Sequence, residues 1–419
     1  MQEFQELGEL IESRWRAQNY NDDRFPEIAA EALTECDLTG KVDPWDIIRW
    51  VHSTPNLPRQ QDPRGKFGNP PITLFVGPRF YVDVYFWLDG TTSIHQHAFS
   101  GAFQVLLGSS VHSRFRFEQE QEINPYFLIG NLSLQSVSLL AKGDTRQILP
   151  GHEFIHSLFH LDRPSATITV RSNHSPSDAI QYSYLKPYIA YDPFFEEDSL
   201  VKKIQTVSLL LSMKHPEADR FIEALIHEAD FQTTFSILKT SFEFLGNNQL
   251  EDLFQIKKSA NRFQSLIDRA RLRHGKLVDR LPEVFEEQLR QKDIVQRRGA
   301  IEGDKHRFFL ALLLNVPNRS GVLELIKNKF PDADPVELAV SWIKELAAIR
   351  IFGSHEPNVL GFEGFDASHL VVFEGLLNGL EDEQIVLLTN QKTSLPKSTI
   401  VEALALIRAL PLFKSIFKK

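Results

Sequence analysis

The sequence predicts a multidomain α+β protein in which a β-rich region lies between two helical regions. In a chain of 419 residues, positions 72–190 hold short runs rich in β-branched and aromatic side chains, separated by turn residues. Such runs are typical of strands in a sandwich or a barrel. On either side, apolar residues recur at helical spacing. We therefore expect a helical lead-in with a proline-rich connection at 1–71, a β domain at 72–190 and an all-α domain at 195–419.

Each element follows from its local pattern. The β runs are RFYVDVYFWL from residue 79, GAFQVLLGS from 101, VHSRFRFE from 111 and SATITVRS from 165. Residues 53–71 hold five prolines and two glycines, which favour an irregular connection. Asp334 can cap a helix that begins at Pro335. The helical stripes are Phe4, Leu7, Leu10 and Ile11; Leu200, Ile204, Val207 and Leu211; Leu250, Leu253 and Phe254; and Phe263, Leu266, Ile267 and Ala270.

Composition excludes several classes of protein. The chain is 42% hydrophobic and 24% charged, which is typical of globular proteins and not of collagen or disordered chains. The single cysteine, Cys36, allows no disulfide, cysteine-based zinc site or iron–sulfur cluster within one chain. The acidic, amphipathic start and the lack of a long apolar run lead us to expect a cytoplasmic protein with no membrane span. The net charge of −9 argues against a protein that coats nucleic acid.

Histidines are concentrated in the β region, which holds seven of the fourteen. His95 and His97 are two residues apart, and on an extended strand both side chains face the same side. That is the placement that two ligands of one metal ion require. His152, His156 and His160 recur every four residues, which fits one face of a helix or of a strand. The β-rich neighbourhood and the turn at Pro150-Gly151 favour the strand.

At these residues the sequence resembles the cupin superfamily, whose small double-sheet barrels hold a metal ion. Gly90 with His95 and His97 matches the first motif, and Gly143 followed by Pro150-Gly151 and a histidine matches the second. The first motif is most similar to the cysteine dioxygenase (thiol dioxygenase) branch. Its matching residues are Trp87, Ser93-Ile94-His95-Gln96-His97, Ser100 and Leu106-Leu107-Gly108. The resemblance covers about residues 80–175 and implies a cupin-like double-stranded jelly roll.

The resemblance also implies a ligand set. The third ligand would be His156, which is followed by Asp162-Arg163-Pro164 and another strand, with His152 and His160 as alternatives. Gly101 and Ala102 stand where many cupins carry a glutamate ligand. The thiol dioxygenases share that loss and use three histidines. Ala102 also replaces a cysteine that some of these enzymes crosslink to a tyrosine.

The residues of the substrate site differ more from the family. Neither Arg64 nor Arg79 is in register with the arginine that clamps the carboxylate of a small thiol, and Arg171 stands where the family has a histidine outside the ligand set. Arg171, if it points inward, would be a costly buried charge without an anion beside it, so it either binds an anionic group of the substrate or forms an ion pair. His160 is a candidate proton carrier. Tyr85 lies on one strand face with Tyr81 and Trp87, either in the core or in the substrate wall.

A metal centre also follows from the chemistry of imidazole. Neutral histidine is the commonest transition-metal ligand in proteins. Three such ligands leave positions open for water, O2 or substrate, as in iron(II) oxygenases and in catalytic zinc sites. We expect Fe(II), with zinc, nickel, manganese and copper as alternatives. His112 and His174 are expected at exposed strand ends.

The predicted function is that of a mononuclear non-haem iron oxygenase, which uses O2 and a small-molecule or carrier-bound substrate. By resemblance the substrate would be a thiol that is oxidised to a sulfinate. Two alternatives remain: a cupin that serves as an interaction module, with or without metal, and a zinc- or manganese-dependent isomerase or hydrolase. No Walker motif, dinucleotide fingerprint, zinc finger or kinase signature is present in the sequence.

The helical half holds one further signal. Residues 257–298 carry twelve Lys or Arg against six Asp or Glu. These charges indicate either a solvated helix surface or a site for an anionic partner, such as RNA, an acidic protein or a phosphopantetheine carrier.

Overall fold

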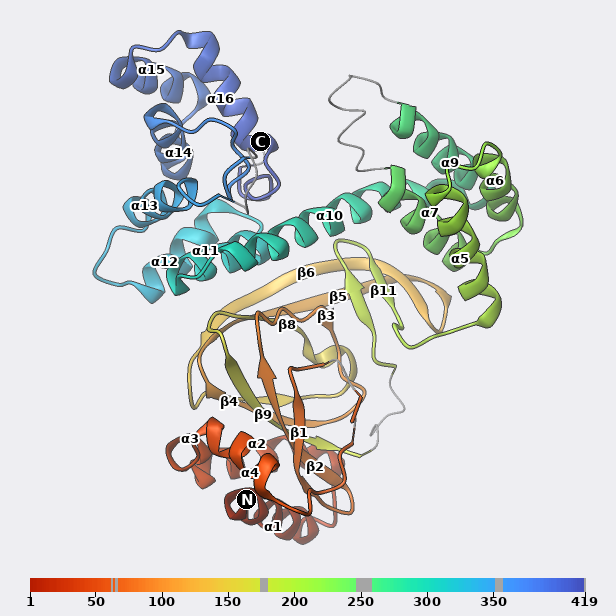
Figure 1. Ribbon diagram of the computed structural model, residues 1–419, viewed down its shortest axis with the longest axis vertical. Coiled ribbons are helices and arrows are strands. Elements are labelled where there is room, and N and C mark those ends of the chain that lie inside the picture. Colours follow the sequence, from red (N-terminus) through yellow and green to blue (C-terminus); the bar gives the residue numbers. More distant parts are fainter. Residues whose placement is uncertain (62, 65–66, 174–179, 246–257, 351–356, 418–419) are drawn as a thin grey trace. The chain divides into compact units, whose positions relative to one another are not determined.

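The computed structural model describes residues 1–419 except 62, 65–66, 174–179, 246–257, 351–356 and 418–419. It is an α+β protein with an antiparallel β-barrel and many helices, as the sequence predicts (Figure 1). The chain forms two compact units. The first comprises Met1–Arg116, Leu134–Ala179 and Arg290–Lys419, and the second comprises Phe117–Ser133 and Ile180–Leu289.

A five-stranded antiparallel sheet in the first unit has the order β1-β2-β9-β4-β7. Its strands are β1 (Pro71–Val76), β2 (Phe80–Trp87), β4 (Gly101–Leu107), β7 (Thr145–Ile148) and β9 (Ser165–Ser172). β2 is buried along its whole length because both of its faces are covered. Phe80, Val82, Val84 and Phe86 belong to a hydrophobic core with the N-terminal helices. The alternate residues, which include Tyr85 and Trp87, face the other way.

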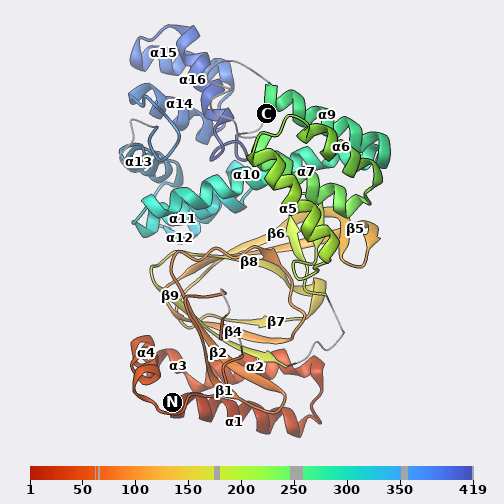
Figure 2. The same ribbon diagram turned by 45° about the vertical axis from the view of Figure 1, so that its right-hand side comes forward.

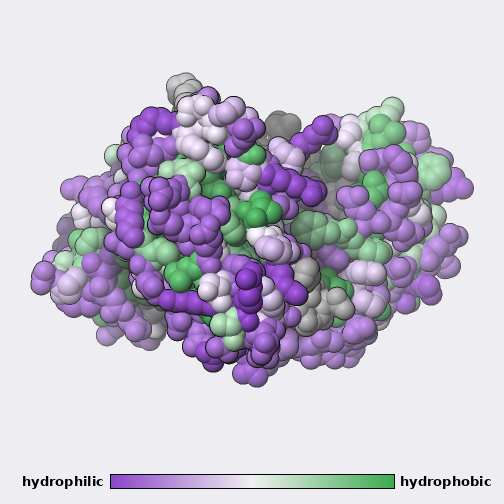
Figure 3. Space-filling model, turned by 90° about the horizontal axis from the view of Figure 1, so that it is seen from below, coloured by the Kyte–Doolittle hydropathy of each residue, from purple (hydrophilic) through white to green (hydrophobic). Residues whose placement is uncertain are grey.

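The N-terminal helices supply the cover for this sheet (Figures 1 and 2). They are α1 (Gln2–Ala17), α2 (Phe25–Cys36), α3 (Leu38–Lys41) and α4 (Pro44–Ser53). The predicted stripe of α1 is confirmed in part, since Phe4, Leu7 and Ile11 are fully buried. Trp15 packs on Phe25 with ring centroids 4.1 Å apart. The surface seen from below in Figure 3 is mostly hydrophilic, which agrees with apolar faces turned inward.

Six strands form the closed antiparallel barrel. Their order is β10 (Ser183–Leu185), β11 (Ile189–Tyr191), β6 (Phe127–Leu140), β5 (Ser110–Asn124), β8 (Ile155–His160) and β3 (Ile94–His95). β8 pairs with β5 on one side and with β3 on the other. β8 faces the five-stranded sheet within the first unit, since the ring of Trp87 on β2 stacks on the ring of His160 on β8 with centroids 4.7 Å apart.

The C-terminal helices complete the first unit. They are the end of α10 (Leu281–Arg297), α11 (Asp304–Asn315), α12 (Arg319–Lys329), α13 (Pro335–Ala347), α14 (Ala367–Asn378), α15 (Asp382–Thr393) and α16 (Lys397–Ala409). The predicted helix start at Pro335 is confirmed: the Asp334 carboxylate accepts from the amides of Val336 and Glu337 at 2.9 Å each. Phe159 and Leu161 at the end of β8 are part of the hydrophobic core of these helices.

The second unit packs helices around its own core. These helices are α5 (Asp198–Ser212), α6 (Ala218–Glu228), α7 (Phe231–Leu245), α9 (Lys258–His274) and the start of α10. The stripes on α5 and α9 are confirmed at Val207, Leu211, Leu266 and Ile267, which are buried in this core. Leu250, Leu253 and Phe254 lie outside the described residues. No helix in the described part of the chain is long and apolar enough to cross a membrane.

Gly101 lies where the backbones of β4 and β9 are close together. It is the register partner of Arg171, and a Cβ added to it would lie 1.9 Å from the carbonyl oxygen of Val170. A glutamate here, as in many cupins, has no room unless the central strand β9 moves. The local packing therefore explains why position 101 carries no side chain.

We expect Gly101→Ala to lower the free energy of unfolding by about 1–3 kcal/mol or more, because the new methyl group overlaps backbone that cannot rotate away. Gly364→Ala is the matched control, since nothing lies within 4 Å of the Cβ added there. Urea unfolding followed by circular dichroism measures both. Equal stability of the two variants would contradict the steric argument.

Candidate metal centre

Three buried imidazoles converge inside the β region of the first unit. His95 on β3 and His156 on β8 are direct register partners. His97 follows β3 and bridges to Pro150, and its carbonyl accepts from the amide of Gly151 at 2.8 Å. The three side chains are 7%, 8% and 3% exposed for His95, His97 and His156. Each offers one ring nitrogen, and these nitrogens lie within 4.8 Å of one another.

Hydrogen bonds set the orientation of two of the rings. Nδ1 of His95 lies 2.8 Å from the carbonyl oxygen of Ser93, so Nδ1 must carry the proton and Nε2 keeps its lone pair. Nδ1 of His156 lies 3.0 Å from Nε2 of His112. When His156 donates in that bond, its own Nε2 is also left with a lone pair. This arrangement, with one nitrogen hydrogen-bonded and the other free, is how metal-binding histidines are held.

The distance between two of the ring nitrogens fits a metal ion. Nε2 of His97 lies 2.9 Å from Nε2 of His156. Two lone pairs at that distance repel each other unless a cation or a proton lies between them. With metal–nitrogen bonds of about 2.0–2.1 Å, the separation corresponds to an angle of about 90° at the metal. The residues present therefore fit an ion with two cis imidazole ligands and His95 as a third.

Burial keeps the three imidazoles neutral. Desolvation lowers the pKa of His95, and it lowers the pKa values of His97 and His156 well below the usual value. Any charge on His95 lowers the pKa values of the other two further, and Arg171 adds to the effect at His97. Neutral rings are ready to bind a metal ion at pH 7, because no proton has to be displaced first.

His112 is the functional residue that the sequence analysis missed. It was expected at an exposed strand end, but it is 2% exposed and is hydrogen-bonded to His156. Along β5, His112 alternates in phase with Arg114 and Arg116, so the pattern indicates a solvated face. His112 instead points inward, where its ring lies 5.9 Å from that of Phe103 and its Nε2 lies 3.0 Å from Nδ1 of His156. His174, which was assigned with His112, lies outside the described residues.

Aromatic rings surround the cluster. Phe154 lies 4.5 Å from the His156 ring, and Phe99 lies 4.6 Å from the His97 ring, between centroids. Phe103 on β4 closes another side at 6.1 Å from His156. These three rings belong to one small buried cluster. They exclude water from one side of the site.

Arg171 lies beside this aromatic wall. Its guanidinium carbon is 3.9 Å from the ring centroid of Phe99 and 5.2 Å from that of Tyr81. Its Nε is buried and has no hydrogen-bond partner in the described part of the chain. Because Phe99 touches both Arg171 and His97, the arginine is near the histidine cluster, as the lowered pKa of His97 also indicates. Arg79 instead covers the ring of Tyr20, and Arg64 is exposed.

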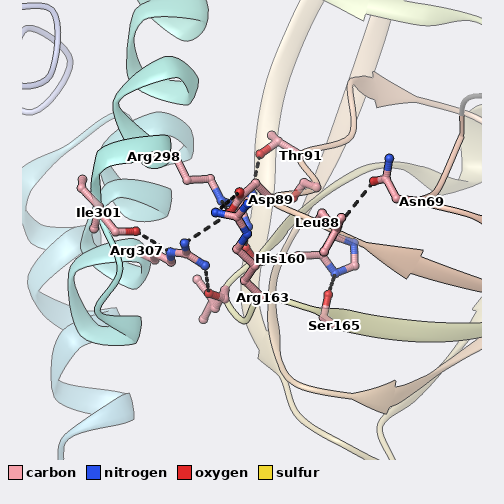
Figure 4. Close-up of polar contacts among 12 residues, drawn as sticks. Asn69, Leu88, Asp89, Thr91, His160, Arg163, Ser165, Arg298, Ile301 and Arg307 are labelled. Atoms are coloured by element: carbon pink, nitrogen blue, oxygen red, sulfur yellow. Dashed lines mark hydrogen bonds and ion pairs between the residues drawn. The ribbon is translucent and has the colours of Figure 1, made fainter. Parts of the chain in front are cut away.

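The remaining predicted site residues lie outside the cluster. The Tyr85 hydroxyl donates to Asp83 at 2.9 Å, and burial raises its pKa, so it stays protonated. Nδ1 of His160 is bonded to the Ser165 hydroxyl at 2.9 Å, as Figure 4 shows. His152 is exposed and lies in the short 3-10 helix Gly151–Phe154. Among the three candidates for the third ligand, only His156 therefore meets His95 and His97.

The buried His160 makes stability depend on pH. Burial lowers its pKa from 6.5 to about 3, so between these pH values the unfolded chain binds a proton that the folded chain does not. Stability from this group is complete above pH 6.5 and is lost as the pH falls. Between pH 7.5 and 5.0 the loss is about 2 kcal/mol.

As the pH is lowered from 7.5 to 5.0, the free energy of unfolding should fall in the wild type and in His160→Gln. We expect the fall to be about 2 kcal/mol smaller in His160→Gln. Glutamine can still bond to Ser165 but has no proton to gain. Urea titrations at the two pH values measure the difference. An equal fall in both proteins would contradict the assignment.

Comparison with protein-family models and with curated proteins found no match. The resemblance to cupins stays a prediction from the motifs at His95, His97 and His156.

Proposed function

We propose that the protein is a mononuclear non-haem iron oxygenase of cupin type, in which His95, His97 and His156 hold Fe(II). The observation that carries the proposal is the convergence of three buried, neutral imidazoles, each of which offers one ring nitrogen within 4.8 Å of the other two. Nε2 of His97 and Nε2 of His156 lie 2.9 Å apart, so a metal ion bound by both rings would replace the proton that they otherwise share.

The donor set favours iron over purely structural metals. A structural zinc site takes four protein ligands, whereas three ligands leave open positions. Iron(II) with three protein ligands and open cis positions is the usual centre for O2 chemistry outside haem, although the better-known form replaces one histidine with a carboxylate. When bound, the metal would supply the redox chemistry. The phenylalanines around it would keep water out of the site.

Arg171 supports an anionic substrate. A guanidinium beside the aromatic wall would bind a carboxylate or another anion and would orient the substrate towards the histidines. The motifs around His95 imply a thiol, to which both atoms of O2 would be added to give a sulfinate. Tyr85 would contribute shape and not proton transfer, because its hydroxyl is engaged by Asp83.

Metal analysis tests the centre. We expect about one equivalent of iron in protein purified without oxygen from iron-supplemented cells, and its loss in His156→Ala, because two imidazoles hold iron far less tightly than three. His152→Ala is the matched control, since His152 belongs to the same histidine run but is exposed. Zinc or manganese in place of iron, with no O2 consumption, would support a hydrolase or isomerase instead. A wild-type protein without any metal would support an interaction module.

Oxygen uptake tests the substrate class. The ferrous protein should consume O2 with cysteine, which carries a carboxylate, and more slowly with cysteamine, which has none. Arg171→Gln should lower kcat/KM for cysteine by about 10- to 100-fold, because a hydrogen bond to a charged group contributes about 1.5–3 kcal/mol. The value for cysteamine should not change. Arg79→Gln, which removes an arginine stacked on Tyr20, should leave both rates unchanged. Equal losses for the two thiols would show that Arg171 binds no carboxylate.

A further inference from the structure

Two arginines of the C-terminal helical segment are buried against the β strands (Figure 4). Arg298 lies in the short 3-10 turn Arg298–Ala300 after α10, and Arg307 lies on α11. Their side chains are 1% and 4% exposed. Buried guanidinium groups are costly unless their donors are satisfied, so their partners show what they hold in place.

Arg298 bonds both to the loop before β3 and to the end of β8. Its Nη1 donates to the carbonyl of Gly90 at 2.6 Å and to the Thr91 hydroxyl at 2.9 Å, and its Nη2 donates to the carbonyl of His160. The guanidinium carbon also lies 4.3 Å from the ring centroid of Phe159. Burial lowers the pKa of Arg298 to about 10, so the group stays charged at neutral pH.

Asp89 is the counter-charge of this cluster. Oδ1 of Asp89 lies 3.2 Å from Nη2 of Arg307 and 3.7 Å from Nε of Arg298. Oδ2 of Asp89 lies 3.2 Å from Nη1 of Arg163. Arg307 in addition donates to the carbonyl of Leu161 at 3.2 Å. Asp89 has φ of 57°, in the left-handed region, so the chain turns sharply at this residue. We call Asp89, Arg298 and Arg307 the arginine clamp.

The clamped residues lead directly into the histidine cluster. After Thr91, the amide of Thr92 donates to Leu158 at 2.9 Å, and the amide of Leu158 donates back to the Thr92 hydroxyl at 2.8 Å. The next pairing along the same two segments is His95 with His156. β3 is only two residues long, so its own ladder gives it little hold on β8. The register of the two segments is therefore set largely by bonds on either side of β3.

We propose that Arg298 is a positioning residue for the metal centre, and that the helical segment Arg290–Lys419 is part of that centre's support. Arg298 ties the loop before His95 to the end of β8, so that His95 and His97 face His156 in the register that brings their nitrogens together. The inference rests on the proposed metal centre, although it concerns metal binding alone and not the reaction.

Cobalt(II) binding to the full-length protein tests the proposal. Its visible absorption reports the geometry of the ligands, and titration against a chelator gives Kd. We expect Arg298→Gln to raise the Kd by about 10-fold or more and to change the spectrum, because supporting groups outside the ligand set commonly alter metal affinity by 10- to 100-fold. Arg298→Lys should recover part of the affinity, since one ammonium can reach some of the same carbonyls.

Arg297→Gln is the matched control. Arg297 is the next residue along the chain, but it bonds to Asp293 and to the carbonyl of Val359, both within the helical segment. Phe309→Leu controls for stability, because Phe309 is fully buried in the helical core and does not belong to the clamp. Both variants should bind cobalt with the wild-type Kd and spectrum at temperatures where circular dichroism shows them folded.

The outcomes separate the two proposals. Wild-type affinity and spectrum in both Arg298 variants would overturn the positioning role while leaving the metal centre intact. Weakened binding in Phe309→Leu to the same extent as in Arg298→Gln would also overturn it, since any loss of stability would then suffice. A wild-type protein that binds no cobalt would overturn the proposed metal centre and, with it, this inference.

Discussion

The structure of the site depends on the cost of burying three imidazoles at one point. Desolvation keeps His95, His97 and His156 neutral, and the bonds of His95 to the Ser93 carbonyl and of His156 to His112 are made by Nδ1, which leaves Nε2 of each ring for other partners. Nε2 of His97 and Nε2 of His156 lie 2.9 Å apart, which requires a cation or a proton between them. The aromatic rings around them cannot donate to these nitrogens. The cluster can therefore bind a metal ion in place of that proton.

The surrounding sheets make that arrangement possible, because their outer faces pack on helices and their inner faces enclose the histidines. Helices α1–α4 cover the outer face of the five-stranded sheet, and the C-terminal helices cover the outer face of β8 at Phe159. His112, His156 and His160 are buried on the inner face, beside the apolar cluster that contains Phe103 and Phe154. Gly101 contributes through its lack of a side chain, which allows β4 to approach β9 closely.

The basic segment at 257–298 forms in part a solvated helix surface, which is one of the two interpretations that its composition allows. Several of its arginines pair within the chain: Arg262 with Asp219, Arg271 with Asp268 and Asp279, and Arg280 with Glu120. Arg298 is buried against the β strands. The segment also crosses from one compact unit to the other inside α10, at Leu289 and Arg290, within the region 195–419 that the sequence treats as one domain. An anionic partner remains a prediction.

Local patterns in the sequence were sufficient to predict the strands, the amphipathic helices, the cap at Asp334 and the pairing of His95 with His97 on one side of the chain. These features depend on periodicity and on motifs a few residues long, so neighbouring side chains determine them. The inward position of His112, the choice of His156 over His160 and the burial of Arg298 were decided only by the tertiary structure. In each case the partner is distant in sequence: His112 meets His156 across β5 and β8, and Arg298 reaches Gly90 from another region of the chain. Sequence spacing carries no record of such contacts, because they arise only when separate segments pack together.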